Sequence, residues 1–386
     1  MKKIVIIITI FFFLFLLEGC TKKKEVDDLI ITTAIALDLN EKEELELSIQ
    51  ILNSNSVGNQ PHEVSPVVVL SETGRTVQEA LRKLATIITG KLFFSHFVIL
   101  VIGEELAKKG ILPYITFFAI NQETLHRFTV AIARGCKGKD ILKVVTVAEH
   151  IPSMSTEGKI AISSSFYGIS KYYTNDEVLS DIKSEGVSLT LGSIVIIGDV
   201  EKGSDLDNRK KIELDAYTKA STIGIFKDDK LVTWMDEEES LGYNYMCGKI
   251  KNSYVVVTKG DGVLATVQVM RNKAKTKMFI EGDKIKFKVM INFEGEIVED
   301  LSGQTSYDEL YCDDLLQRAK YEIKVFCEKA IAKAQESKTD IFEFGQMIYH
   351  QKYKFWQEIK DKYEDEIFPN IEIEVIVEGE IMRVKP

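Results

Sequence analysis

The first twenty residues restrict which part of the chain can fold as a water-soluble body. Met1 is followed by two lysines, and residues 4–17 then form an apolar run that only Thr9 interrupts. A helix that crosses the roughly 30 Å hydrocarbon core of a bilayer needs about 20 apolar residues, and this run is shorter. A short apolar run behind a cationic start is typical of a signal peptide that is removed after export. We therefore expect residues 1–19 to be a signal peptide.

A cysteine directly follows the apolar run. The run ends at Leu17-Glu18-Gly19-Cys20, and the chain then becomes polar. A small residue before a cysteine at this place resembles the lipobox of bacterial lipoproteins, in which the thiol receives a diacylglyceryl group and becomes the new N-terminus. Glu18 departs from that pattern, because the lipobox usually has a small or apolar residue there. We expect Cys20 to be a lipid-attachment site that holds the protein on a membrane; the alternatives are an ordinary secretory signal and an uncleaved anchor.

Composition places the rest of the chain among globular proteins. Of the 386 residues of the whole chain, 45% are hydrophobic and 28% are charged, and this length allows two or three domains. Acidic residues outnumber basic ones by 59 to 49, which gives a net charge of −10. Because the chain is acidic and has no basic stripe with interleaved aromatic residues, we expect no nucleic acid among its partners.

The cysteines beyond Cys20 are too scattered to form a metal site. Cys136, Cys247, Cys312 and Cys327 make no CxxC pair and no cluster with histidine at zinc spacing. The last two fall fifteen residues apart in one predicted helix, roughly 22 Å from each other, which is beyond disulfide reach. We expect free, mostly buried thiols, and a Cys136–Cys247 bond stays open.

The first half of the chain mixes strands with helices. Hydrophobic alternation predicts strands at 29–39 and 45–52, and Thr76-Val77-Gln78-Glu79 is a capping box that begins a helix. An apolar run at 93–102 predicts a central strand and is followed by helical spacing and a further strand at 128–133. This order predicts at least one βαβ unit.

The second half has a different pattern. Strands at 278–280 and 285–293 surround Gly282-Asp283 and predict a hairpin. A second capping box at 306–309 begins a long helix, another helix follows Asp340, and an alternating strand at 371–377 ends the pattern. The sequence therefore predicts an α+β fold of several domains, three in our interpretation, with mixed sheets and helices. The C-terminal domain is expected to be an antiparallel sheet packed by two long helices.

Domain borders follow from changes in composition. We expect the signal peptide at 1–19 and an N-terminal region at 20–200 that divides into two subdomains near 140–150. A charged, aperiodic segment at 201–211 is the expected linker, and 212–386 is the expected C-terminal domain.

No motif in the chain specifies catalysis. The sequence has no phosphate-binding loop, no dinucleotide fingerprint, no nucleophile elbow and no zinc-protease motif. Among five scattered histidines, His96 lies in an apolar run and is expected to be a hydrogen-bonded core residue. The acidic run 236–239 is expected to be a solvated turn. We predict no catalytic, cofactor or metal-binding residues and no enzymatic activity.

An ordered set of short segments resembles the Ger(x)C family, the lipoprotein C subunits of spore germinant receptors. The segments run from the cysteine at the lipobox to an asparagine near the C-terminus: Cys20, Gly74-Arg75-Thr76, Phe94-Ser95-His96, 98–107, 224–232, 237–242 and Phe368-Pro369-Asn370. Each segment is short, and their common order covers nearly the whole mature chain.

The resemblance implies both a place and a role. Members of this family lie on the outer face of the spore inner membrane beside two polytopic membrane subunits, with which they detect nutrients and commit the spore to germinate. The family fold has three α/β-type domains without a known enzymatic site, and Cys20 is the residue that carries over, as the lipid anchor. The alternative function is an extracytoplasmic solute-binding lipoprotein of a transporter. A third is a lipid-anchored hydrolase, for which the sequence lacks a nucleophile or metal motif.

Overall fold

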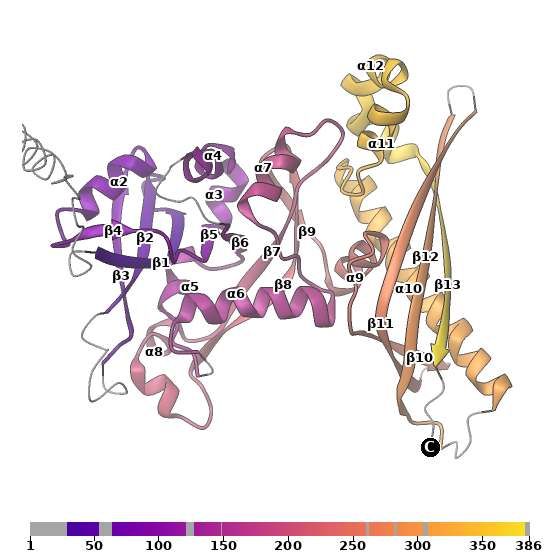
Figure 1. Cartoon of the computed structure of the whole chain (residues 1–386), viewed down its shortest axis with the longest axis horizontal. Coiled ribbons are helices and arrows are strands. Elements are labelled where there is room, and N and C mark those ends of the chain that lie inside the picture. The colour runs from indigo at the N-terminus through magenta and orange to yellow at the C-terminus, as the bar shows by residue number, and fades with distance from the viewer. Residues whose placement is uncertain are drawn as a thin grey trace, which may run out of the picture.

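The computed structural model describes residues 29–53, 64–120, 127–147, 149–259, 262–281, 284–303 and 308–382. The expected signal peptide, Cys20 and the first two residues of the capping box at 306–309 lie outside these ranges. Figure 1 shows two β-sheets, each packed with helices, in the two halves of the molecule. The expected mixture of sheets and helices is confirmed.

The first sheet has nine strands in the order β3-β2-β1-β5-β6-β7-β8-β9, with β4 paired to β1. Strands β1, β5, β6 and β7 run parallel, and the strands at either end of the order are antiparallel to their neighbours. The strands are β1 (Leu29–Leu39), β2 (Leu45–Leu52), β3 (Val67–Gly74), β4 (Lys91–Phe93), β5 (Ile99–Gly103), β6 (Thr129–Ala133), β7 (Thr190–Gly198), β8 (Ala216–Lys227) and β9 (Lys230–Trp234). The predicted βαβ unit is confirmed by β5 and β6, which helices connect.

Helices cover both faces of this sheet. On one face, Ala80, Leu106, Ile115 and Val178 pack against the strands, and they come from α2 (Val77–Leu84), α3 (Glu104–Lys109), α4 (Leu112–Ile120) and α7 (Asn175–Lys183). The opposite face is covered by α5 (Gly138–Lys143) and α6 (Pro152–Ile162), which is continued by a π-helical turn, η4 (Ser163–Tyr167). Thr76 accepts from the backbone of Glu79 and caps α2, as the sequence predicts.

The second sheet has the order β10-β11-β12-β13. Its strands are β10 (Ser253–Lys259), β11 (Gly262–Glu281), β12 (Lys284–Asp300) and β13 (Glu372–Met382). The first three are antiparallel, as expected, but β13 runs parallel to β12. The expectation of a wholly antiparallel sheet is corrected here, because the helices between β12 and β13 return the chain to the end of the sheet at which β12 begins.

One long helix and two shorter ones follow β12. They are α10 (Glu309–Ser337), α11 (Phe344–Gln351) and α12 (Tyr353–Lys362), and short turns η6 (Tyr363–Ile367) and η7 (Phe368–Asn370) lead into β13. The second long helix predicted from the sequence is thus divided at Lys352, whose φ of −140° and ψ of 55° are not helical. Asp308 caps α10 by accepting from the backbone of Tyr311.

The segment predicted as an interdomain linker connects two neighbouring strands of the first sheet. Residues 201–211 form parts of α8 (Val200–Gly203) and η5 (Leu206–Lys210) between β7 and β8, which pair antiparallel with each other. Asn208 is buried and donates from its side chain to the carbonyl of Ala216 at 2.8 Å, which fixes this connection to β8. The first sheet continues beyond residue 211, since β8 and β9 belong to it.

The two sheets share a continuous core. Ile223 and Ile225 of β8 belong to the same buried cluster as α9 (Glu237–Met246), α10 and the inner face of the second sheet. Backbone hydrogen bonds join the halves as well, since Ser188 donates to Asp340 at 3.0 Å and Gln346 donates to Gly186 at 3.1 Å. The φ of Gly186 is 74°, and a Cβ there would lie 2.4 Å from the backbone of the second half, so this contact requires glycine.

Candidate functional site

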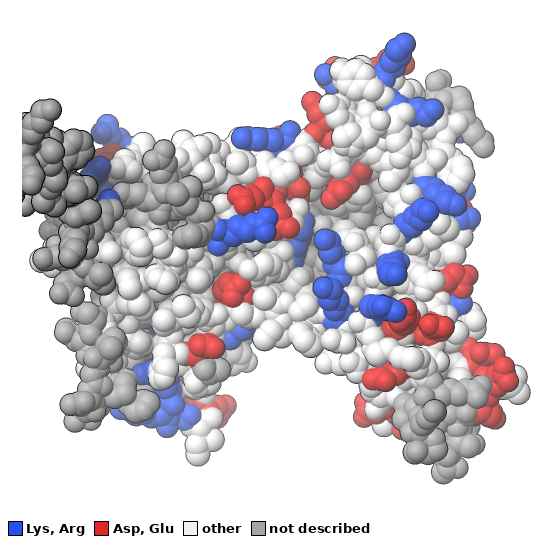
Figure 2. Space-filling view, viewed as in Figure 1, with Lys and Arg blue, Asp and Glu red and all other residues white. Residues whose placement is uncertain are grey.

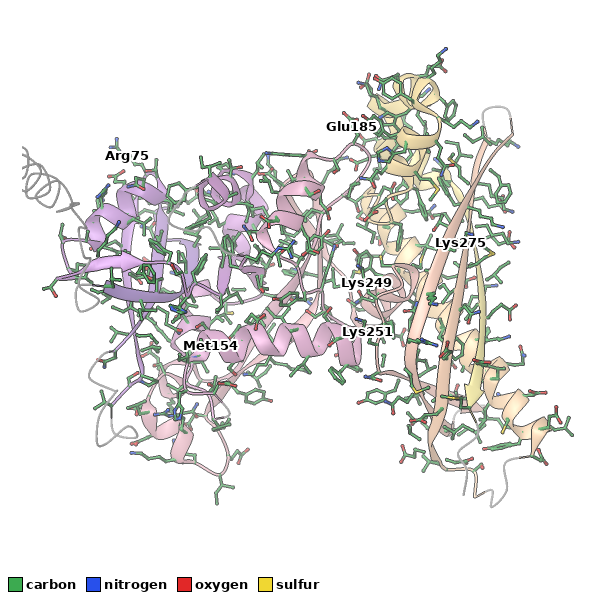
Figure 3. All side chains as sticks on the ribbon, in the orientation of Figure 1. Arg75, Met154, Glu185, Lys249, Lys251 and Lys275 are labelled. Atoms are coloured by element: carbon green, nitrogen blue, oxygen red, sulfur yellow. The ribbon has the colours of Figure 1, made fainter. Side chains whose placement is uncertain are left out.

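A cavity of about 1050 Å³ lies where the two halves of the molecule meet. One wall comes from the segment that precedes α7, another from the C-terminal end of α9, and a third from the residues around the start of α11. Figure 3 labels Lys249 and Lys251 at this junction. Lysine, tyrosine, phenylalanine and methionine side chains line it together with Glu177 and Glu343, so the cavity combines apolar surface with charges of both signs.

Lys171 has its ammonium group among neutral partners in this cavity. Its Nζ donates to Thr190 Oγ1 at 2.8 Å and to Tyr243 Oη at 3.0 Å. The same atom lies 3.6 Å from the ring centroid of Tyr173, in cation–π geometry. Burial lowers the pKa of Lys171, because a charged group loses hydration there. The charge is therefore held by hydroxyl dipoles and an aromatic face.

The carboxylates near Lys171 have other partners. Tyr173 donates from its hydroxyl to Asp181 at 2.5 Å, and burial raises the pKa of this tyrosine. Glu177 accepts from the backbone and the hydroxyl of Thr174, as the end of a capping box for α7. These two carboxylates are thus used to fix Tyr173 and the start of α7.

The C-terminal end of α9 adds a protonated thiol to the cavity. Burial raises the pKa of Cys247 to about 11, although the nearby Lys171 lowers it in part. At neutral pH this cysteine is a thiol and not a thiolate nucleophile. The free cysteines include Cys136, Cys247, Cys312 and Cys327, which confirms the expected free thiols. The last two both lie in α10, as predicted, and they are buried while the first two are half-buried.

The acidic run 236–239 begins α9 and thereby positions Tyr243. Asp236 accepts from the backbone of Glu239 at 2.7 Å, and Glu239 accepts from the backbone of Asp236 at 2.8 Å. The expectation of a solvated turn at 236–239 is therefore wrong. The structure shows a helix N-terminus instead, and the signal that could have identified it is the aspartate–glutamate spacing of a capping box.

His96 is not a core residue. The expected strand at 93–102 is interrupted by a turn in which Phe97 donates to the carbonyl of Phe94, and His96 is exposed on it. β4 ends before this turn and β5 begins after it. The prediction of one continuous strand at 93–102 is therefore wrong, because Phe94 and Phe97 bury their side chains although they lie in a turn and not in a strand.

Four lysines form a cationic rim at the cavity and on the neighbouring strand β11, where Lys275 and Lys277 point to the opposite face of the strand from the cavity-lining Thr276. Lys249 and Lys251 lie in the turn after α9, and Lys275 and Lys277 lie on β11; all four are exposed. Within the described ranges, none of the four makes an ion pair with a carboxylate. Figure 2 shows blue side chains gathered where the two halves meet.

The described part of the chain contains neither a metal-binding cluster nor a membrane-spanning helix. Its histidine, cysteine and acidic side chains form no group of three or more that could hold a metal ion. None of its helices combines the length and apolar character needed to cross a bilayer. Cys20, the predicted lipid-attachment site, lies outside the described residues.

Two family models match most of the chain. The model described as spore germination protein N-terminal domain matches residues 22–196, and the model described as spore germination B3/GerAC like, C-terminal, matches residues 221–385. The interval between the two matches contains the segment 201–211.

Whole-chain comparisons agree with the family models. Spore germination protein KC of Bacillus subtilis (strain 168) is 25% identical over 99% of this chain and 96% of its own length. Spore germination protein B3 of the same organism is 23% identical over 91% of this chain and 90% of its own length. The crystal structure of the GerBC protein has a similar fold, with a TM-score of 0.54 and 18% identity over 90% of this chain and 96% of that one. The chain therefore belongs to the spore germination B3/GerAC-like family.

Proposed function

We propose that this chain is the lipid-anchored, non-enzymatic subunit of a spore nutrient germinant receptor. It acts in germination through contacts with two polytopic membrane subunits, on the extracytoplasmic face of the spore inner membrane. The observation that carries the proposal is the match to germination proteins over nearly the full length of both chains. The short apolar run that ends at Gly19-Cys20 supports the lipid anchor.

The geometry of the cavity agrees with a binding role better than with catalysis. Its lysine is held by neutral groups, its thiol is protonated, and the carboxylates of Asp181 and Glu177 are engaged in fixing a tyrosine and a helix start. A general acid or base needs a free group whose pKa lies near the working pH. These side chains serve instead to shape a charged surface between the two halves.

Deletion and complementation test this proposal. Spores that lack the gene should fail to germinate with one class of nutrient, and the wild-type gene should restore the response. Cys20→Ala should leave the protein outside the membrane fraction and restore germination poorly. Cys136→Ala is the matched control, because it removes a thiol of the folded body without touching the anchor.

Two results would contradict the proposal. If Cys20→Ala protein stays in the membrane fraction and germination is normal, the lipid anchor is wrong. If germination is normal with every nutrient in the absence of the gene and of its paralogues, the receptor function is wrong.

A solute-binding lipoprotein of a transporter is the second candidate, and the cavity between the two halves favours it. Such a protein binds its solute as an isolated chain. Calorimetry with the purified chain and the transported solute would show binding in that case, and the receptor proposal does not require it.

A further inference from the structure

Strand β11 has an open edge in its second half. β10 pairs with β11 only as far as the Ser253–Val269 pair. Beyond that point the turn after α9 takes over, since Asn252 donates to Met270 and Asn272 donates to Ile250, each at 3.3 Å. For residues 274–281, the described part of the chain provides no further strand on this side.

The direction of the backbone groups along this edge follows from Asn272. Its N–H points toward the turn, and in an antiparallel strand the N–H and C=O groups of every second residue point to the same side. The backbone groups of Ala274, Thr276, Met278 and Ile280 therefore point to this side. Gly248 covers Ala274, since a Cβ on Gly248 would lie 3.1 Å from the Ala274 nitrogen, so the edge is open from Thr276 onward. Thr276 also lines the cavity, so the edge and the cavity form one surface.

This surface is cationic in an otherwise acidic chain. The net charge of the protein is −10, yet the cationic rim of Lys249, Lys251, Lys275 and Lys277 has no carboxylate in ion-pair contact within the described residues. Lys277 lies directly opposite Lys288 in the β11–β12 register, and of these two lysines Lys288 is paired with Glu374 at 3.3 Å. A group of unpaired cations of this kind favours an anionic partner.

Lysines on an edge strand also prevent two copies of a protein from pairing edge to edge. That role explains Lys275 and Lys277, which are on the strand, but it does not explain Lys249 and Lys251. These two lie on the cavity rim beside apolar side chains that include Met347. A second copy of this chain would also place lysine against lysine, so a partner of opposite charge fits better.

We propose that the open edge of β11 binds an extended, acidic segment of another protein. The segment adds a strand along residues 276–281 and places its carboxylates against the cationic rim. Backbone hydrogen bonds supply affinity in this mode of recognition, and side chains supply specificity. The inference goes beyond the proposed function, because it rests on the edge and its charge and not on the germination phenotype.

Fluorescence anisotropy with a defined peptide tests whether the positive charge of the cationic rim contributes to binding. The full chain, purified in mild detergent, is titrated into a labelled peptide in which glutamate alternates with valine. We expect saturable binding that weakens at high salt, and a Kd at least about tenfold higher for the double variant Lys249→Glu, Lys275→Glu. Lys219→Glu is the control, because Lys219 is exposed on β8 and lies outside the cavity; this variant should bind like the wild type.

Two further measurements test the edge itself. Thr276→Pro removes an N–H that points outward, a position at which an edge strand tolerates proline, and it should weaken peptide binding while the fold is kept. In the wild-type chain, the peptide should slow hydrogen exchange at the amides of Thr276, Met278 and Ile280. The exchange measurement does not depend on whether the proline variant folds.

Several results would overturn the proposal. They are the absence of saturable binding, equal binding by the double lysine variant, and unchanged hydrogen exchange at these three amides. If vesicles of phosphatidylglycerol bind through the same lysines and the peptide does not, the partner is a lipid surface instead. Any of these results leaves the germination test unaffected, so the two proposals fail separately.

Discussion

The close contact between α9 and α10 predicts that a larger side chain at Gly242 will destabilise the protein. This residue lies in α9, where a Cβ would be 2.0 Å from the carbonyl oxygen of Phe326 and 2.8 Å from the backbone nitrogen of Cys327. Both atoms belong to the backbone of α10 and cannot rotate away. Gly242→Ala must therefore push the two helices apart.

The expected change in stability is the sum of two opposed effects. Alanine in a helix interior is favoured over glycine by about 1 kcal/mol. Overpacking a tight core costs about 1–3 kcal/mol, and a contact with rigid backbone should lie near the upper end. We expect Gly242→Ala to lower the free energy of unfolding by about 2 kcal/mol.

Gly158→Ala is the matched control, because Gly158 lies in α6 and a Cβ there would meet nothing within 4 Å. This variant should raise the free energy of unfolding by about 0.5–1 kcal/mol. Both variants are compared with the wild type by urea unfolding, followed by circular dichroism. If Gly242→Ala stabilises the protein as much as Gly158→Ala does, the inferred helix contact is wrong.

Three other predictions concern buried groups. Burial raises the pKa of Asp340 from 3.8 to about 6. This shift contributes about 3 kcal/mol to the free energy of unfolding at pH values below the unfolded pKa, and the contribution is lost as the pH rises toward 6. Asp340→Asn should flatten this part of the curve in urea titrations at several pH values, and an unchanged curve would contradict the assignment. Phe344→Ala should lower the free energy of unfolding by about 3–5 kcal/mol in the same assay, because Phe344 is 1% exposed and its ring centroid stacks 4.3 Å from that of Phe287. A loss below about 1 kcal/mol would show that the stack matters little. Burial raises the pKa of Cys136 to about 12 and of Cys247 to about 11. Iodoacetamide at pH 8 should therefore label both cysteines slowly in the folded chain and rapidly in urea, as measured by mass spectrometry. Rapid labelling of the folded chain would contradict their burial.

Local patterns in the sequence predicted much of the secondary structure. The strands at 29–39 and 45–52 have the expected bounds, because each alternates or stays apolar over its full length. The helix predicted after Thr76 is also as expected, since Thr76 accepts from the backbone of Glu79 at its start. Where one short-range rule decides the structure, the residues themselves are sufficient.

Long-range contacts explain what the sequence did not reveal. The parallel direction of β13 depends on where three helices return the chain, and no local pattern contains that information. The break between α11 and α12 falls at Lys352, an ordinary helix-forming residue whose conformation is set by its surroundings. The cavity was not foreseen either, because Lys171, Tyr243 and Phe342 are far apart in the chain and carry no motif.

The shared core of the two sheets has a mechanical consequence. Ile223 and Ile225 on β8 pack in the core that both sheets share, and backbone hydrogen bonds from Ser188 to Asp340 and from Gln346 to Gly186 join the two halves. A rotation of one sheet against the other would therefore have to break these bonds and expose buried apolar surface.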